Sequence, residues 1–101
     1  MPPHQKFRLS PSARTDLREV QAYYESEQAG LGGRFIRLAV AAFDDIVLRP
    51  SSFPVFYKGV RRARIKSFPI GIFFRISAEE IRVIAVLDLR RDPRWLRGRL
   101  R

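Results

Sequence analysis

The sequence predicts an α+β fold in which two helices pack on one face of a mainly antiparallel sheet. Three observations indicate this class. Apolar residues recur at helical spacing in two adjacent segments before residue 50. After residue 50, short segments are β-rich or alternate between apolar and polar residues, as half-buried strands do. Strands that follow a helical hairpin as a group, instead of alternating with helices, are typical of α+β domains.

The first expected elements are a short strand over 6–9, where polar and apolar residues alternate, and a helix over 11–27. Ser10 can accept a hydrogen bond from the first free amides of this helix, and Pro11 suits its first position. We expect Asp16 to lie early in the helix, where the helix dipole favours an anion.

A second helix is expected over 33–48, because its apolar residues cover a face broader than a surface helix needs. Pro50 ends it. The glycines at positions 30, 32 and 33 form a short loop between the two helices. Such a loop predicts an antiparallel helical hairpin, with the second helix mostly buried against the sheet.

The remainder of the chain is strand-like and ends in a short helix. The expected strands span 61–68, 70–77 and 81–89, and the segment 55–57 is a candidate for a further short strand. The expected order is therefore β-α-α-β-β-β, followed by the short helix. Asp92 and Pro93 begin the final helical turns, and we expect Trp95 and Leu96 to anchor these turns to the rest of the domain. Alternation along the strands places the hairpin on one face of the sheet and the arginines on the other.

The charge of the chain is concentrated in its second half. Its 101 residues suit a single domain, which we place at 6–101 after a flexible tail at 1–5. The net charge is +10, with +1 in residues 1–50 and +9 in residues 51–101, and 17 of the 20 basic residues are arginine. Because the guanidinium fork matches carboxylate and phosphate, this bias favours an anionic macromolecular partner.

The residues needed for most enzyme chemistry are missing from the sequence. There is no cysteine, and the single histidine, His4, falls in the expected tail. These counts exclude thiol catalysis, zinc–thiolate sites and histidine-based triads. The carboxylate pairs Asp44-Asp45 and Glu79-Glu80 have no basic residue placed for general acid–base catalysis. We therefore predict no catalytic residue, no metal and no cofactor.

No segment approaches the ~18 consecutive apolar residues of a membrane span, and the first residues lack an apolar secretion signal. We expect a cytoplasmic protein without a membrane partner.

The candidate binding residues come from the strands and the C-terminal turn. They are Arg62, Arg64, Lys66, Arg75, Arg90, Arg91, Arg94 and Trp95. Alternation places the first four on the face away from the core, and the others follow the last strand. Such a surface can bind nucleic-acid phosphate or an acidic protein segment.

Four segments, in order, give the chain a resemblance to a known family. They are FRLSPSARTDL at 7–17, RF at 34–35 followed by Pro50, VRR at 60–62 leading to SFPI at 67–70, and LRRDPRW at 89–95. With these segments the chain, from residue 6 to about 99, resembles the ParE/RelE superfamily, the toxins of bacterial type II toxin–antitoxin systems. The resemblance is closer to the ParE branch.

The resemblance implies a toxin that binds DNA gyrase without chemistry of its own and is neutralised by a cognate antitoxin. It implies that operator DNA is bound only through the antitoxin. The alternative is a ribosome-dependent mRNA endoribonuclease of RelE type. That chemistry uses basic residues with a Tyr or His near the C-terminus, and no Tyr or His follows Tyr57, so Lys66 would have to act instead. A third hypothesis is a nucleic-acid-binding domain without toxicity.

Overall fold

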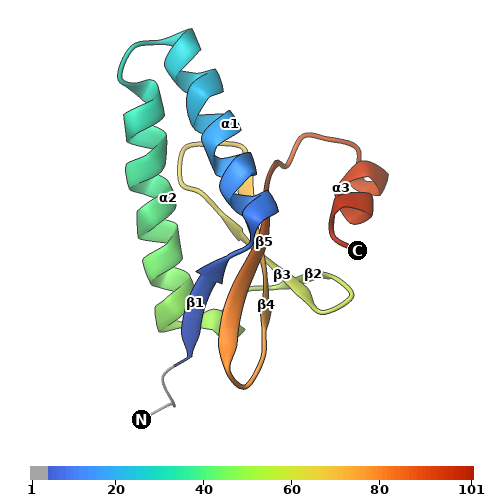
Figure 1. Cartoon of the computed structure of the whole chain (residues 1–101). Helices are drawn as coiled ribbons and strands as arrows, with labels where there is room; N and C mark the ends of the chain where they lie inside the picture. Colours follow the sequence, from blue (N-terminus) through green and yellow to red (C-terminus); the bar gives the residue numbers. More distant parts are fainter. Residues whose placement is uncertain (1–4) are drawn as a thin grey trace.

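A five-stranded sheet with the order β1-β5-β4-β3-β2 organises the computed structural model, which describes residues 5–101. The two long helices lie on one side of this sheet and a short C-terminal helix on the other (Figure 1). The elements are β1 (Lys6–Leu9), α1 (Pro11–Glu27), α2 (Leu31–Leu48), the 3-10 turn η1 (Pro50–Ser52), β2 (Val55–Tyr57), β3 (Val60–Arg64), β4 (Ile70–Ile76), β5 (Glu80–Asp88) and α3 (Pro93–Arg99).

The α+β class and the element order of the sequence prediction are confirmed. Strands β2 to β5 pair antiparallel in chain order, and β1 pairs parallel with β5. The predicted tail at 1–5 lies outside the described residues except for Gln5, and His4 lies outside them too.

The N-terminus of α1 has the predicted cap. The Ser10 hydroxyl accepts a hydrogen bond from the Ala13 amide at 3.0 Å, and Pro11 occupies the first helical position. Because the Ser10 amide also donates to the Val83 carbonyl of β5 at 2.9 Å, the chain passes from the sheet into α1 without a loop.

The start of the second helix differs from the prediction. Helix α2 begins at Leu31, two residues before the predicted position 33, and Gly30 precedes it with a φ of 89°. Glycine adopts this left-handed conformation at no steric cost, so one residue reverses the chain. Gly32 packs against α1, where a Cβ atom would lie 2.7 Å from the Gln21 carbonyl oxygen. The glycines therefore bring the two helices close as well as turning the chain.

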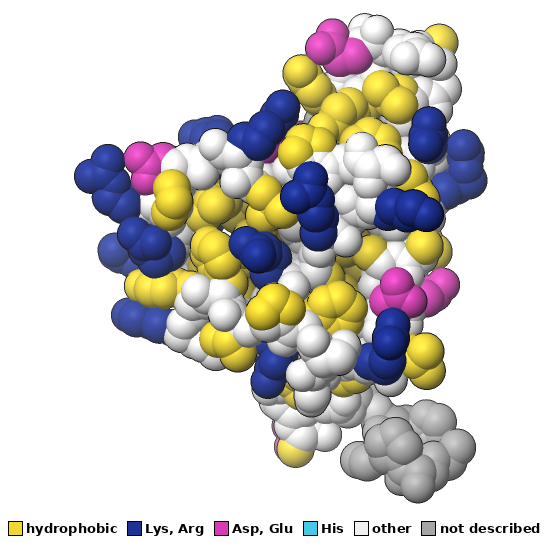
Figure 2. Space-filling view, turned by 180° about the vertical axis from the view of Figure 1, so that it is seen from behind, with side chains coloured by type: hydrophobic (Ala, Val, Ile, Leu, Met, Phe, Trp, Pro, Cys, Tyr) yellow, Lys and Arg dark blue, Asp and Glu magenta, His cyan; other side chains and the backbone are white. Residues whose placement is uncertain are grey.

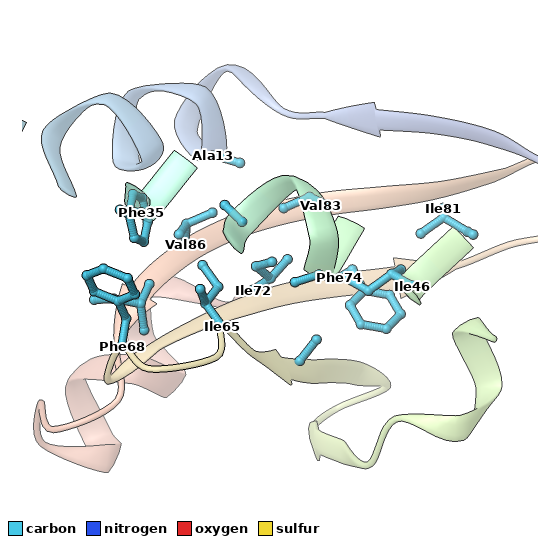
Figure 3. Packing of buried hydrophobic residues seen from close by; sticks show 14 residues of the cluster. Ala13, Phe35, Ile46, Ile65, Phe68, Ile72, Phe74, Ile81, Val83 and Val86 are labelled. Carbon is cyan, nitrogen blue, oxygen red and sulfur yellow. The ribbon is translucent and has the colours of Figure 1, made fainter. Parts of the chain in front are cut away.

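The larger hydrophobic core lies between the helical hairpin and the sheet. Figure 3 shows Phe35 and Ile46 of α2 facing Ile72, Phe74 and Val83 of the central strands. All five side chains are fully buried. The buried residues of α2 thus pack on the inner face of the sheet, which Ile72 and Phe74 share, while Val40, Val47 and Leu48 of α2 stay exposed.

A second hydrophobic cluster lies on the opposite face of the sheet, under α3. Its buried residues are Val60, Phe73, Ala85, Leu87, Leu96 and Leu100. The prediction that this face belongs to the arginines is therefore wrong over the part that α3 covers. Phe73 of β4 is fully buried there, and Ile84 of β5 is half-buried.

Strand β3 is shorter than the predicted segment 61–68, because it ends at Arg64. The Ile65 amide still donates to the Ile70 carbonyl of β4, and the Ile65 side chain is buried in the main core, as alternation predicts. The turn that follows contains Ser67 with a φ of 69°, and the Phe68 amide bonds within it to the Ile65 carbonyl. Alternation therefore does not place the side chains that follow Ile65. Within residues 5–101, no helix has the length and apolar character needed to cross a membrane.

Candidate binding surface

Helix α3 begins with a cap that its own sequence supplies. The Asp92 carboxylate accepts a hydrogen bond from the Arg94 amide at 2.7 Å, and Pro93 occupies the first helical position. The same carboxylate forms an exposed ion pair with the Arg94 guanidinium at 3.3 Å. These bonds lower the pKa of Asp92, the Arg94 side chain contributing most. The carboxylate therefore stays charged at mildly acidic pH and continues to cap α3 there.

Two kinds of contact fix α3 to the rest of the molecule. Leu96 and Leu100 are 3% and 0% exposed and insert into the second hydrophobic cluster. Arg99 donates to both carboxylate oxygens of Asp16 at 2.9 Å. Because the Val86 amide donates to Oδ2 of the same carboxylate at 3.1 Å, Asp16 connects α1, β5 and α3. The prediction that Asp16 serves the helix dipole misses this role, since its carboxylate is buried in tertiary contacts.

The outer surface of α3 carries an arginine stacked on its tryptophan. The guanidinium carbon of Arg91 lies 3.7 Å from the centre of the Trp95 ring, and that of Arg99 lies 5.7 Å from it. Guanidinium groups are attracted to the face of an indole ring. The stacking therefore orients Arg91 while its donors stay exposed beside Arg94.

Three further candidates lie on the same face of the sheet as α3. Arg62 is half-buried, with its guanidinium carbon 5.4 Å from the centre of the Phe56 ring. Arg64 is exposed and follows it by two residues on β3. Arg75 is exposed on β4, two residues beyond the buried Phe73, and donates to the Lys58 carbonyl at 2.8 Å. The prediction that these three arginines point away from the helical hairpin is confirmed.

Lys66 does not belong to that face. It lies in the turn after β3 and lines a groove of about 290 Å³ with Arg34, Arg37 and Leu38 of α2. The predicted grouping of Lys66 with Arg62 and Arg64 is therefore wrong, because Lys66 lies beyond the end of β3, in the turn that contains Ser67.

Arg90 also turns toward the helical hairpin. It lines two adjoining grooves, of about 420 and 360 Å³, together with Tyr23 and Tyr24 of α1. Its guanidinium binds the Asp88 carboxylate through two hydrogen bonds, of 3.0 and 2.7 Å. This fork lowers the pKa of Asp88 and raises that of Arg90, and burial raises the pKa of Tyr24.

Sequence reasoning missed Arg34 and Arg37 as neighbours of Lys66. Both are exposed on α2, three residues apart, but only the tertiary fold brings the turn after β3 beside them. Sequence reasoning also missed that Tyr24 meets Phe68, whose ring centre lies 4.7 Å away, and that both residues line the larger groove.

The molecule thus has a cationic face around α3 and a groove of mixed cationic and aromatic character beside the helical hairpin. Seen from behind, Lys and Arg side chains outnumber Asp and Glu and gather toward the edge where α3 lies (Figure 2). Within residues 5–101, no group of three or more His, Cys, Asp or Glu side chains is placed to hold a metal ion.

This fold and these surfaces define a small basic protein with an arginine-bearing C-terminal helix packed against its sheet. A family model described as "ParE toxin of type II toxin-antitoxin system, parDE" matches residues 7–93. The chain therefore belongs to the ParE toxin family, the toxins of type II toxin–antitoxin systems.

A comparison with solved structures agrees on the fold. The chain is similar to a structure described as "Chromosomal ParDE TA system from P. aeruginosa", with a TM-score of 0.74 and 16% sequence identity. The similarity covers 85% of this chain and 97% of that chain. At this identity the likeness shows a shared fold. No curated protein matches the chain.

Proposed function

We propose that this toxin inhibits growth by binding DNA gyrase in the cytoplasm, without catalysing a reaction of its own. The observation that carries the proposal is the fixed cationic surface of α3. Arg91 and Arg94 are exposed there, while Leu96 and the Asp16–Arg99 pair hold the helix in place. A surface that is ordered before binding loses little entropy when it meets an acidic partner.

The residue content of this surface favours binding over RNA cleavage. The aromatic residue on α3 is Trp95, whose indole cannot transfer a proton at neutral pH, and its neighbours are arginines. General acid–base cleavage at a 2′-hydroxyl needs a group that titrates near the working pH. Lys66, the alternative base, is exposed in the turn after β3, beside α2 and away from α3.

A supercoiling assay tests the gyrase target. Relaxed plasmid and purified gyrase are incubated with increasing amounts of toxin. We expect loss of supercoiling and accumulation of cleaved DNA at micromolar toxin. Full supercoiling activity at that concentration rejects gyrase as the target.

Primer extension on translated messages in induced cells tests the alternative. Intact messages are expected for a gyrase-binding toxin. Cuts in phase with codons would instead assign the ribosome-dependent endoribonuclease activity, and would make Lys66 the first residue to substitute.

We further propose that a cognate antitoxin neutralises the toxin by placing an acidic, amphipathic segment in the groove beside the helical hairpin. Tyr24 and Phe68 line this groove together with Arg34 and Arg90. Apolar side chains of the segment would cover the rings while its carboxylates pair with the arginines. In this scheme operator DNA is recognised by the antitoxin, and the toxin joins it indirectly.

Growth on induction tests neutralisation. We expect toxin alone to stop growth and co-expression of a small acidic protein encoded beside it to restore growth. The variant Arg34→Glu should need more antitoxin for the same rescue, whereas Arg14→Glu, on the exposed side of α1, should not. Equal rescue of both variants would place the antitoxin elsewhere on the toxin.

A further inference from the structure

Three arginines form a straight row across three adjacent strands. Arg8 of β1 is the register partner of Arg82 of β5, and Arg82 is the register partner of Arg75 of β4. Because Phe7 and Phe74 point into the main core, the three arginines point to the opposite face. All three are exposed.

Arg75, at one end of the row, also contacts the turn between β2 and β3. Arg75 Nη1 donates to the carbonyl of Lys58 at 2.8 Å, which places the β2–β3 turn beside β4. Neighbouring strands are ~4.8 Å apart, so the three arginine side chains leave the sheet from adjacent backbone positions. Like charges directly opposite each other weaken a sheet. The folded chain therefore carries a costly arrangement that a bound polyanion would relieve.

Little inside the protein neutralises the row. Arg8 pairs with Glu80 at 3.1 Å, but its side chain is 55% exposed, and such surface pairs contribute little. Within residues 5–101, the Arg82 side chain has neither an ion pair nor a hydrogen bond. Arg82, at the centre of the row, thus has its full set of donors available to solvent.

The side chains on the strands of the row indicate which kind of partner would bind there. The large hydrophobic side chains that are exposed in the described part of the chain lie on α1, α2 and β2; they are Tyr23, Val40, Val47, Leu48 and Val55. None is on a strand that carries the row. Protein interfaces contain an apolar centre, whereas DNA interfaces are more polar and much more positively charged. Single-stranded nucleic acid is usually held by exposed aromatic rings, which these three strands do not offer among the described residues.

We propose that the row of Arg8, Arg82 and Arg75 binds the phosphate backbone of duplex DNA without sequence preference. The exposed guanidiniums form charge-assisted hydrogen bonds with successive phosphates along one side of the duplex. This contact lies on the α3 side of the sheet but uses strand residues instead of Arg91 and Arg94, and it is separate from the groove beside the hairpin. It does not depend on the gyrase proposal, and sequence recognition of the operator stays with the antitoxin.

The salt dependence of DNA binding tests the row. Purified toxin is titrated into a fluorescein-labelled 20-base-pair duplex of arbitrary sequence, and the anisotropy is followed between about 50 and 200 mM salt. Each phosphate contact contributes ~0.9 to the slope of log K against log salt concentration. The variant R8Q/R75Q/R82Q should therefore lower the slope by roughly 2 to 3, and R82Q alone by about 1.

A matched variant controls for net charge. R14Q/R18Q/R37Q removes three exposed arginines from the two helices and changes the net charge by the same amount. Its slope should stay close to that of the unmodified toxin. The single variant R82Q keeps the test valid if the triple variant unfolds, because Arg82 makes no ion pair or hydrogen bond within residues 5–101.

Two outcomes would overturn the proposal. One is an equal loss of slope in the row variant and the helix variant, which would mean a diffuse charge effect. The other is binding of poly-glutamate or of a single strand as tight as binding of the duplex. Supercoiling inhibition that survives in R82Q alongside a reduced DNA slope would show that the row and the gyrase contact are independent.

Discussion

Arg99 of α3 donates two hydrogen bonds of 2.9 Å to Asp16 of α1, although 83 residues separate them in the sequence. The carboxylate also accepts from the Val86 amide at 3.1 Å, where β5 extends beyond its partner β1. Asp16 is 7% exposed and the Arg99 side chain 34% exposed. One buried acidic group therefore completes the edge of the sheet and sets the position of the C-terminal helix.

Substitution of Asp16 should destabilise the protein more than substitution of Arg99. Asp16→Ala leaves the buried Val86 amide without an acceptor, which we expect to cost about 2–3 kcal/mol in the free energy of unfolding. Arg99→Ala should cost about 1 kcal/mol, because solvent already reaches the guanidinium. Urea unfolding measures both values. Glu19→Ala, on the exposed side of α1, should change stability by less than about 0.5 kcal/mol. Equal effects at Asp16 and Glu19 would contradict this role.

Substitution by alanine should have opposite effects on stability at two neighbouring glycines of α2. At Gly32 a Cβ atom would lie 2.7 Å from the backbone oxygen of Gln21, so Gly32→Ala must push the helices apart. We expect a loss of about 2 kcal/mol. At Gly33 the nearest atom is Arg37 Nη1 at 3.6 Å, an ordinary contact. Gly33→Ala should stabilise the helix by about 0.5 kcal/mol. Thermal unfolding of the two variants checks the contrast, and similar Tm values would reject the close packing of α1 and α2.

The stability contributed by Glu25 should depend on pH. Its carboxylate accepts hydrogen bonds from the amides of Gly30 and Gly32 at 2.9 Å, and these bonds lower its pKa, Gly30 first. A lowered pKa in the folded state means that this contribution is present above the ordinary glutamate pKa and is lost as pH falls through the folded value. Glu25→Gln should therefore lower Tm at pH 7 and change it little at pH 3. A Tm difference that stays constant over this range would refute the amide bonds.

Loosening α3 should remove activity before it unfolds the sheet. Leu96 is 3% exposed in the second hydrophobic cluster, and Leu96→Ala should cost about 2–4 kcal/mol. We expect faster hydrogen exchange in α3 and a shift of Trp95 fluorescence toward that of exposed tryptophan. If gyrase inhibition persists while α3 exchanges freely, the ordered helix is not the binding element.

Much of the fold could be predicted because local sequence patterns indicate where its helices begin and which face of a strand is buried. Ser10 and Pro11 mark the start of α1, and alternation on β4 separates Ile72 and Phe74 from Phe73. The parallel pairing of β1 with β5 and the second cluster under α3 have no local signal. The pairing depends on which strand edge β1 meets, and the cluster depends on which surface buries the hydrophobic residues of the C-terminal helix. Only the complete tertiary structure determines either one.

The candidate surface could be predicted only in part for a related reason. Arg62 and Arg64 lie within a strand, where alternation fixes the face of each side chain. Lys66 and Arg90 lie just beyond strand ends, where the direction of a side chain is set by turn geometry. The partner of Asp16 could not be foreseen, because a carboxylate in the first turns of a helix is explained equally well by the helix dipole.

If Arg91, just before α3, and Arg94, in its first turn, carry the proposed inhibition of gyrase, a titration of gyrase supercoiling with toxin variants will show it. The wild-type toxin, Arg91→Ala/Arg94→Ala and the helix control Arg14→Ala/Arg18→Ala are compared at equal concentrations, after circular dichroism shows that all are folded. We expect inhibition by the wild type and the helix control, and at least about tenfold weaker inhibition by Arg91→Ala/Arg94→Ala. Equal inhibition by all three proteins, or by none of them, would contradict this expectation.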